Sequence, residues 1–412
     1  MSLFDQHRIF LYQNYLLYAI AFLLPVTPKI VPLLIVVFGL LSFYAIFKKY
    51  SRAHLSEVSI LLALLFLLHV VGMFYTSNTN RGLFDLEVKL SLIVFPLVFI
   101  GFKFVNTTNF KTTLRMFLFG SVAAAVICLG QSSYEYFIND MPYYYFLTSR
   151  FSVIIHQSYF AMYLIFSMLI LAYLAWDQLK ENGWKNRILN LLLMLFLSLC
   201  VILTGSKTGF IIWVIVVFGM VAFLVKEMTH KWIPILGLMV LTSLVGVIFR
   251  EAPLLQSRIV NVLQITQNEE VNPLATESTE VRYLVYSSAW DIINSQPWYG
   301  MGTGDFQDEL DKIYEERGYK FAHARHLNTH NQFLQSWIAL GIPGITLILG
   351  IFIVMFQQAL KNRDWLYVGF TTIFLVISLT ESSLYMQAGV VYFSFFAVLF
   401  ARKSQSNPEP EA

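Results

Sequence analysis

The sequence is short of charge and of cysteine. Charged residues make up 13% of the 412 positions, and the formal net charge is +3. So little charge excludes an ordinary soluble domain, and the lack of a long basic run argues against nucleic acid as a partner. The 2 cysteines, Cys128 and Cys200, each lie inside an apolar run. We interpret both as small buried hydrophobic residues, without a disulfide framework or a CxxC motif.

We also expect no cleavable signal peptide, since no small-residue cleavage site follows the first apolar run, near residues 15–25. Hydrophobic residues instead make up 57% of the chain, with 37 Phe and 22 Tyr. Aromatic side chains in such numbers are typical of membrane interfaces. We therefore expect an all-α polytopic membrane protein whose first apolar run is its first transmembrane helix.

Apolar runs that could cross a membrane recur along the chain. A spanning helix needs about 20 apolar residues, fewer where neighbouring helices shield its ends, and on this basis we predict about 12 spans. They lie near residues 12–26, 30–47, 57–75, 86–104, 112–138, 153–175, 187–204, 209–226, 232–249, 331–358, 365–380 and 384–401. Polar residues interrupt the ends of the fourth, sixth and eleventh of these runs.

Lys and Arg concentrate in every second connection between the spans. The cation-rich connections hold Lys48, Lys49 and Arg52; Lys103, Lys111 and Arg115; Lys180, Lys185 and Arg187; Lys226 and Lys231; and Lys361 and Arg363. By the positive-inside rule these connections and both termini are cytoplasmic. We accordingly divide the chain into helices 1–9 (residues 1–250), an outward-facing loop subdomain (251–330), helices 10–12 (331–401) and a disordered cytoplasmic tail (402–412).

The outward loop has a helical pattern. Residues 281–293 carry apolar side chains at helical spacing, and Pro297 ends the segment. A glycine-rich turn over residues 300–304 follows, which we interpret as a sharp backbone turn and not as a nucleotide loop, because no strand precedes it. Asp305 then suits the cap position of a second helix, Phe306 to Arg317.

The candidate chemistry lies where this loop meets a long apolar helix. His323, His326 and His330 are spaced so that one helix face would hold all three, which makes a zinc site the first rival interpretation. The segment Asn328-Thr329 looks like a helix start, however, and no HExxH motif is present. We expect no metal, and we interpret His330 either as a helix cap or as a general base at the membrane face.

Cations on the same outward side favour the catalytic interpretation. Taken one at a time, these cations could simply snorkel to the lipid headgroups; they are Arg282, Arg150 and Lys207. Together with a histidine they suit a lipid-linked diphosphate, whose charge they would neutralise. Glu381 would orient His330 or pair with a cation, unless it is an ordinary loop carboxylate, and Asn331 and His326 are further supporting candidates.

These features resemble the O-antigen ligase and O-antigen polymerase superfamily. The resemblance is carried by about a dozen spans with a long outer loop, by Arg282 followed by Pro297-Trp-Tyr-Gly300-Met-Gly302, and by His330-Asn331 leading to Gly341-Ile-Pro-Gly344. Leu203-Thr-Gly-Ser206-Lys207-Thr-Gly209 is similar to the Ser-Arg-Gly-type turn of the family, with Lys207 where the family commonly has arginine. Lys207 keeps the charge but loses the bidentate fork of arginine.

The resemblance implies a GT-C-like bacterial glycosyltransferase of the inner membrane, with its active site on the periplasmic face and no cofactor. Such an enzyme moves a glycan from undecaprenyl diphosphate to an acceptor hydroxyl. His330 would be the base, and Arg282 and Arg150 would bind the diphosphate. Ligase, with lipid A-core as acceptor, is the preferred function; polymerase, with a second lipid-linked glycan, and transfer to protein stay open. A transporter of lipid-linked glycans is the rival from another class, although nearly all mid-span positions are apolar and His69 is the main exception.

Overall fold

The structure, a computed structural model, consists of helices joined by turns. It describes residues 2–50, 55–102, 107–179, 184–227, 272–276 and 278–406, together with scattered positions between 231 and 250, and no strand occurs among them. The chain forms two compact units. Unit 1 contains Met1–Leu17, Val31–Phe110 and Ile265–Ala412, and unit 2 contains Tyr18–Ile30 and Lys111–Gln264.

Six helices of the described part are long and apolar enough to cross a membrane. They belong to α1 (Ser2–Val26), α3 (Glu57–Gly72), α6 (Thr107–Phe137), α8 (Gln157–Leu179), α10 (Lys207–Glu227) and α16 (Gln332–Lys361). Shorter apolar helices are α2 (Val31–Phe47), α9 (Trp184–Leu203) and α17 (Trp365–Ser378). The described part of the chain is therefore all-helical, and the protein is a multi-pass membrane protein, as its composition predicts.

One predicted span is divided in the structure. Instead of a continuous helix over 86–104, α4 (Thr79–Lys89) ends before Leu90 and α5 (Ser91–Ile100) begins after it. Helix α4 is the polar part of this stretch, and its Asp85 and Lys89 form a buried ion pair four residues apart. The predicted span 232–249 lies largely outside the described residues, so the total of about 12 spans stays a prediction.

Unit 1 is organised around its last helix, α18 (Gln387–Ser406). Almost every side chain from Val390 to Ala401 is buried, as expected for a helix that is apolar on all sides. It packs against α3, α5 and α16, and Phe393 stacks on Phe374 of α17 with ring centroids 4.1 Å apart. The helix continues to Ser406, past the predicted start of the tail at 402, and residues 407–412 lie outside the described part.

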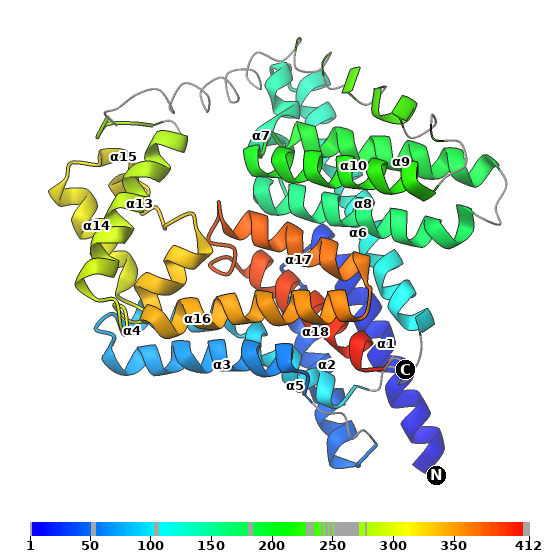
Figure 1. The fold of residues 1–412 in the computed structure, drawn as a ribbon, viewed down its shortest axis with the longest axis horizontal. Coiled ribbons are helices and arrows are strands. Elements are labelled where there is room, and N and C mark those ends of the chain that lie inside the picture. Colours follow the sequence, from blue (N-terminus) through cyan, green and yellow to red (C-terminus); the bar gives the residue numbers. More distant parts are fainter. Residues whose placement is uncertain are drawn as a thin grey trace. The chain divides into compact units, whose positions relative to one another are not determined.

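Helices α3 and α16 run side by side in unit 1 (Figure 1). They are antiparallel, because Gln358 near the end of α16 donates to Glu57 at the start of α3, and the end of α3 meets Leu340 early in α16. The last turn of α3 and the first turns of α16 therefore lie at the same end of the unit.

A small helical subdomain covers that end of unit 1. It contains α13 (Ser278–Ser295), α14 (Phe306–Glu316) and the short α15 (Lys320–Ala324), of which the first two match the predicted helices (Figure 1). Asp305 does not cap α14 with its side chain, contrary to expectation. Its carboxylate instead accepts hydrogen bonds from the backbone N–H groups of Ser77 and Asn78, both at 2.7 Å, and so ties the α3–α4 connection to the subdomain.

The glycine-rich turn fills a break in α16. Pro343 lacks the N–H that would bond Ala339 O one turn earlier, and Gly341 between them has φ +66°. The freed carbonyls of Ile338 and Ala339 accept from the N–H groups of Met301 and Gly302, at 2.8 and 3.0 Å. The turn is thus a structural plug that satisfies the backbone groups of a broken helix inside a membrane protein.

Replacing Gly341 by alanine should destabilise the protein strongly. A Cβ at this position would lie 2.3 Å from the carbonyl oxygen of Trp298, and the left-handed backbone alone costs about 1–3 kcal/mol for a residue with a side chain. We expect a lower melting temperature for the purified protein in detergent. Gly350→Ala is the matched control, because it lies in the same helix with open space around it; equal melting temperatures for the two variants would contradict this role of Gly341.

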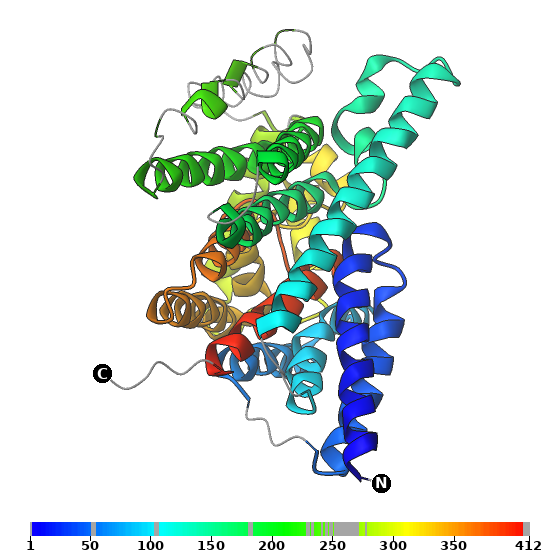
Figure 2. The ribbon, with the colours of Figure 1, turned by 90° about the vertical axis from the view of Figure 1, so that its right-hand side faces the viewer.

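Unit 2 contains α6, α7 (Thr148–Phe151), α8, α9 and α10. Helices α8, α9 and α10 pack against one another (Figure 2), and α8 is the most buried, with Tyr159 to Met168 almost inaccessible. The turn between α9 and α10 has Gly205 at φ +59°, and Ser206 Oγ accepts from Gly209 N at 3.0 Å. Gly209 lets α10 approach α8 closely, since an added Cβ would meet Ala161 at 2.5 Å.

Candidate active site

His330 lies in the loop between α15 and α16, in a left-handed backbone conformation with φ +46°. Its N–H donates to Asn328 Oδ1 at 2.9 Å, which closes a local turn of the kind that asparagine favours. Asn331 caps α16, because its Oδ1 accepts from the N–H groups of Phe333 and Leu334. The cap interpretation of His330 is therefore wrong, and its imidazole is free of any capping role.

The imidazole instead faces Glu381, on the loop between α17 and α18. His330 Nδ1 lies 3.2 Å from Glu381 Oε2, and the other carboxylate oxygen accepts from Arg282 NH2, also at 3.2 Å. The Glu381 side chain is only 10% exposed, whereas His330 and Arg282 are 27% and 21% exposed. One buried carboxylate thus joins a base and a cation, which come from segments far apart in the sequence.

Tyr286 and Asn331 hold this arrangement from two sides. The Tyr286 hydroxyl donates to His330 O at 3.3 Å and lies 3.5 Å from Leu379 O. Asn331 Nδ2 donates to the same Leu379 carbonyl at 3.1 Å. Burial raises the pKa of Tyr286, so its hydroxyl stays a donor. These bonds tie the His330 segment to the Glu381 segment through backbone atoms.

A buried polar network lies beneath the pair. The Thr329 hydroxyl donates to Gln335 Oε1 at 2.8 Å, and its oxygen lies 3.1 Å from Ser382 Oγ. Ser382 Oγ in turn lies 3.2 Å from Asn328 Oδ1. These hydrogen bonds join the loop that carries His330 to the loop that carries Glu381, although Nε2 of Gln335 is buried without a hydrogen-bond partner among the described residues.

The geometry defines what His330 can do chemically. If Glu381 is ionised, it can only accept, so the proton of a neutral imidazole sits on Nδ1. Nε2 then carries the lone pair and is available to take a proton from a hydroxyl group. A carboxylate that orients a histidine in this way is the arrangement found in hydrolytic triads.

The two other predicted cations lie in unit 2. The guanidinium of Arg150, in α7, lies 4.6 Å from the ring centroids of Tyr144 and of Tyr145, a double cation–π contact. Lys207 is the first residue of α10 and is partly buried. The structure therefore brings Arg282, His330 and Glu381 together, and it places Arg150 and Lys207 in the other unit.

The three histidines do not share a helix face. Helix α15 ends at Ala324, and His326 and His330 both have φ +46°, so the spacing on which the zinc interpretation depends is broken. His326 is exposed and pairs with Asp311 at 2.8 Å, away from the Glu381 cluster. Among the described residues, no group of three or more His, Cys, Asp or Glu side chains is placed to hold a metal ion.

Sequence reasoning named Glu381 and Asn331 as supporting residues but missed Tyr286, which ties the His330 segment to the Glu381 segment. Tyr286 follows Arg282 by four positions and so lies on the same face of α13, a spacing that was visible in the sequence. The Asn328-Thr329-His330 pattern was a signal for a local turn. Sequence reasoning also missed the partners of His69, which is buried 3.6 Å from Asp85, whose carboxylate binds Lys89.

Comparison with known proteins bears on the same region. Residues 192–349 match the family model described as O-antigen ligase, and no curated protein matches the chain. The matched segment contains Lys207, Arg282 and His330, whereas Arg150 and Glu381 lie outside it. This match confirms, over residues 192–349, the resemblance to the O-antigen ligase and polymerase superfamily, whose members are glycosyltransferase-like enzymes.

Proposed function

We propose that the protein is an O-antigen ligase-like glycosyltransferase that moves a glycan from undecaprenyl diphosphate to an acceptor hydroxyl. The observation that carries the proposal is the Arg282–Glu381–His330 chain, with both His330 and Arg282 3.2 Å from one buried carboxylate. It offers an oriented base and a cation in one place, which are the two groups that such a transfer needs.

In the proposed reaction, His330 Nε2 takes the proton of the acceptor hydroxyl. The acceptor oxygen forms a bond to the anomeric carbon as the bond from that carbon to the diphosphate oxygen breaks. Undecaprenyl diphosphate leaves with the electron pair. Because attack and departure occur on opposite faces of the sugar, the anomeric configuration is inverted. Glu381 stays ionised and stabilises the imidazolium that forms.

Arg282 is the proposed diphosphate ligand of unit 1. Its guanidinium carries five N–H donors, and its Nε is buried without a hydrogen-bond partner among the described residues. An unsatisfied buried donor costs about 1–3 kcal/mol, and an oxygen of a bound diphosphate would supply the missing acceptor. Arg150 and Lys207 are proposed as further ligands on the strength of the family resemblance. We propose that these cations, and not a metal ion, neutralise the leaving group.

We further propose a GT-C-like fold with about 12 spans, placed in the bacterial inner membrane with both termini cytoplasmic. The lysine and arginine pattern supports this orientation, and it puts the end of α3 and the start of α16 on the same, periplasmic side. In unit 1 both helix ends contact the same subdomain, through hydrogen bonds to residues 301–303. This contact is consistent with both ends being on one side of the membrane.

A transfer assay tests the function. Purified protein receives an undecaprenyl-diphosphate-linked glycan and a lipid A-core acceptor, with a chelator present. We expect labelled glycan on lipid A-core. Longer glycans on the polyprenyl carrier would instead identify a polymerase that uses the same site, and dependence on added metal would refute the metal-free mechanism.

One observation favours a transporter as the second candidate. His69, Asp85 and Lys89 form a buried titratable cluster in α3 and α4, and ionisable groups inside membrane proteins often mark transport pathways. Movement of the lipid-linked glycan across the membrane of proteoliposomes, without any transfer to an acceptor, would show that the protein is a transporter and not a glycosyltransferase.

Replacing Arg282 by alanine should weaken donor binding by about tenfold or more, because a charge-assisted bond to phosphate is lost. The measurement is the Kd for undecaprenyl diphosphate in detergent. Arg317→Ala is the matched control, since Arg317 also belongs to the subdomain and also pairs with a carboxylate, that of Asp291. Equal affinities for the two variants would show that Arg282 has only a structural role.

A further inference from the structure

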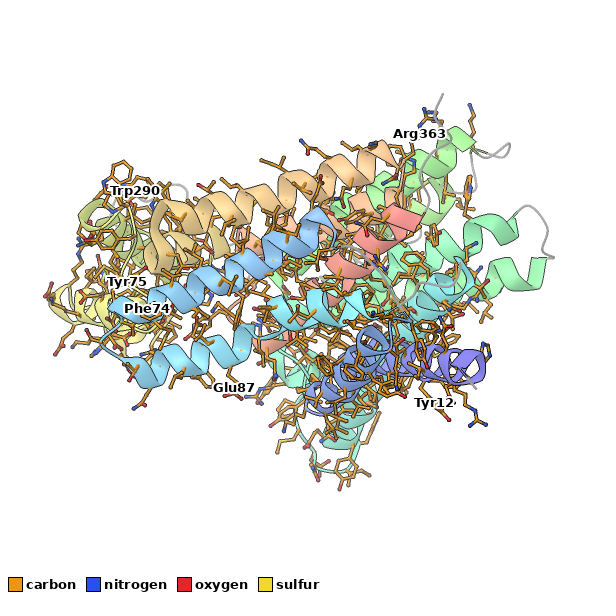
Figure 3. The ribbon with its side chains drawn as sticks, turned by 90° about the horizontal axis from the view of Figure 1, so that it is seen from below. Tyr12, Phe74, Tyr75, Glu87, Trp290 and Arg363 are labelled. Atoms are coloured by element: carbon orange, nitrogen blue, oxygen red, sulfur yellow. The ribbon has the colours of Figure 1, made fainter. Side chains whose placement is uncertain are left out.

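A second polar site lies in unit 1, where the α3–α4 connection faces the subdomain. A pocket of about 450 Å³ opens there, lined by Tyr75, the Gly300–Met301 turn and the first turn of α14. Its volume is within the range of small-molecule sites. Figure 3 labels Phe74 and Tyr75 at this end of α3, close to the subdomain.

Two aromatic rings belong to the pocket lining. Tyr75 and Tyr299 are 40% and 55% exposed, and their rings meet edge to face with centroids 5.9 Å apart. The Tyr75 hydroxyl donates to the backbone carbonyl of Tyr299 at 2.7 Å, which holds the Tyr75 ring in place. Rigid, exposed aromatic rings offer flat apolar surface at low cost in conformational entropy.

Some polar side chains of the pocket lining are hydrogen-bonded to the protein, and others are not. Asp305 accepts from two backbone N–H groups, and Asp308 binds Arg81 and Asn78. By contrast, the side chains of Gln296 and Glu309 line the pocket half-buried and make no hydrogen bond within the part of the chain that the structure describes. They supply one amide, which both donates and accepts, and one carboxylate, which accepts.

The charge of the lining restricts the ligand. Three carboxylates and no cation line the pocket, and the nearby Arg81 is held by Asp308. Phosphate and acidic sugars would be repelled, as like charges in one site are. A divalent cation is also disfavoured, since two of the carboxylates already have partners and no three-residue metal group occurs in the described residues.

We propose that this pocket binds a saccharide of neutral or amino sugars. The apolar face of a pyranose ring would stack on Tyr75 or Tyr299, and Gln296 and Glu309 would bond to its hydroxyl or amino groups. The pocket is distinct from the Arg282–Glu381–His330 site, and saccharide binding does not depend on transfer. On a lipid-linked glycan, the cationic Arg282 site would bind the diphosphate, and the acidic pocket would bind sugar residues.

The test is saturation-transfer NMR and calorimetry on the full-length protein in nanodiscs, without any polyprenyl donor. The probes are neutral tetrasaccharides of glucose, galactose, mannose and N-acetylglucosamine, a chitosan tetramer that carries free amino groups, and a tetragalacturonate that carries carboxylates. We expect millimolar or tighter binding of the chitosan tetramer and of at least one neutral probe, and none of tetragalacturonate.

Two substitutions locate the binding. Tyr299→Leu should weaken every bound probe by about five- to tenfold, through loss of the aromatic face. Glu309→Gln should weaken only the chitosan tetramer, by about tenfold, because the charge-assisted bond is lost. Tyr283→Leu and Glu316→Gln are the matched controls, since both side chains are exposed on the same subdomain outside the pocket.

Three results would overturn the proposal: binding of no neutral or amino probe, tetragalacturonate binding as tightly as the neutral probes, or equal effects of the pocket and control variants. His330→Ala should bind the probes as the unmodified protein does. Failure of the transfer assay therefore leaves this test intact, and failure of this test leaves the proposed transfer intact.

Discussion

Replacing His330 by alanine should reduce glycan transfer by roughly 10²–10⁴-fold, the usual contribution of a general base. The fold should survive, because Asn331 and not His330 caps α16, and the network of Thr329, Gln335 and Ser382 does not use the imidazole. The measurement is the initial rate of transfer at saturating donor and acceptor, together with the melting temperature.

His323→Ala is the control for this experiment. His323 belongs to the same segment, and its ring lies edge to face with the ring of His326, at a centroid distance of 6.2 Å. We expect its rate to stay within about twofold of the unmodified protein. A His330→Ala protein that turns over normally would remove the base from the mechanism, whereas an equal loss in both variants would show a general effect of the loop.

Glu381→Gln should be nearly as damaging as loss of the histidine itself. Arg282 presents only N–H donors, so the glutamine oxygen must face Arg282 and its NH₂ group must face His330 Nδ1. The NH₂ group donates a hydrogen bond to Nδ1 and so favours the imidazole tautomer that carries its hydrogen on Nε2. In that tautomer Nε2 has no free lone pair and cannot take a proton from the acceptor hydroxyl. The equivalent change in a serine-protease triad lowers kcat by about 10⁴-fold.

The readout is kcat, with KM for the donor measured alongside. A tautomer effect lowers kcat and leaves KM nearly unchanged, whereas a general loss of structure changes both. Glu57→Gln is the control, because Glu57 also contacts α16, through Gln358 at the far end of the helix. In a His330→Ala background, Glu381→Gln should cost little more. A full additional loss there would mean that Glu381 acts independently of His330.

The sequence predicted the helices that carry the site better than the contacts between its side chains. Apolar runs and turn residues are local signals, so α13, α14 and α16 begin and end near their predicted positions. Whether Glu381 meets His330 depends on how α17, α18 and α13 pack, which no local pattern encodes. The contact of one carboxylate with both His330 and Arg282 therefore appears only in the structure.

Two predictions show where local reasoning is weakest. Asp305 occupies the position of a helix cap, yet its carboxylate is used by the backbone of Ser77 and Asn78, more than two hundred residues earlier. The Gly300–Gly304 turn has the composition of a sharp turn, but its position is set by the broken helix that it plugs. In both cases a tertiary contact decides which of several local roles a residue fulfils.

Gly300 of the turn and Gly341 of α16 lie at the closest approach between the turn and the broken helix. A Cβ on Gly300 would lie 2.7 Å from Gly341 N, and a Cβ on Gly341 would meet the carbonyl of Trp298, two residues before Gly300. Neither position therefore accepts a side chain while the loop and the helix stay in contact. Because the clashing atoms belong to the backbone of the opposite segment, a side chain at either glycine could be accommodated only by rebuilding the joint between the subdomain and α16.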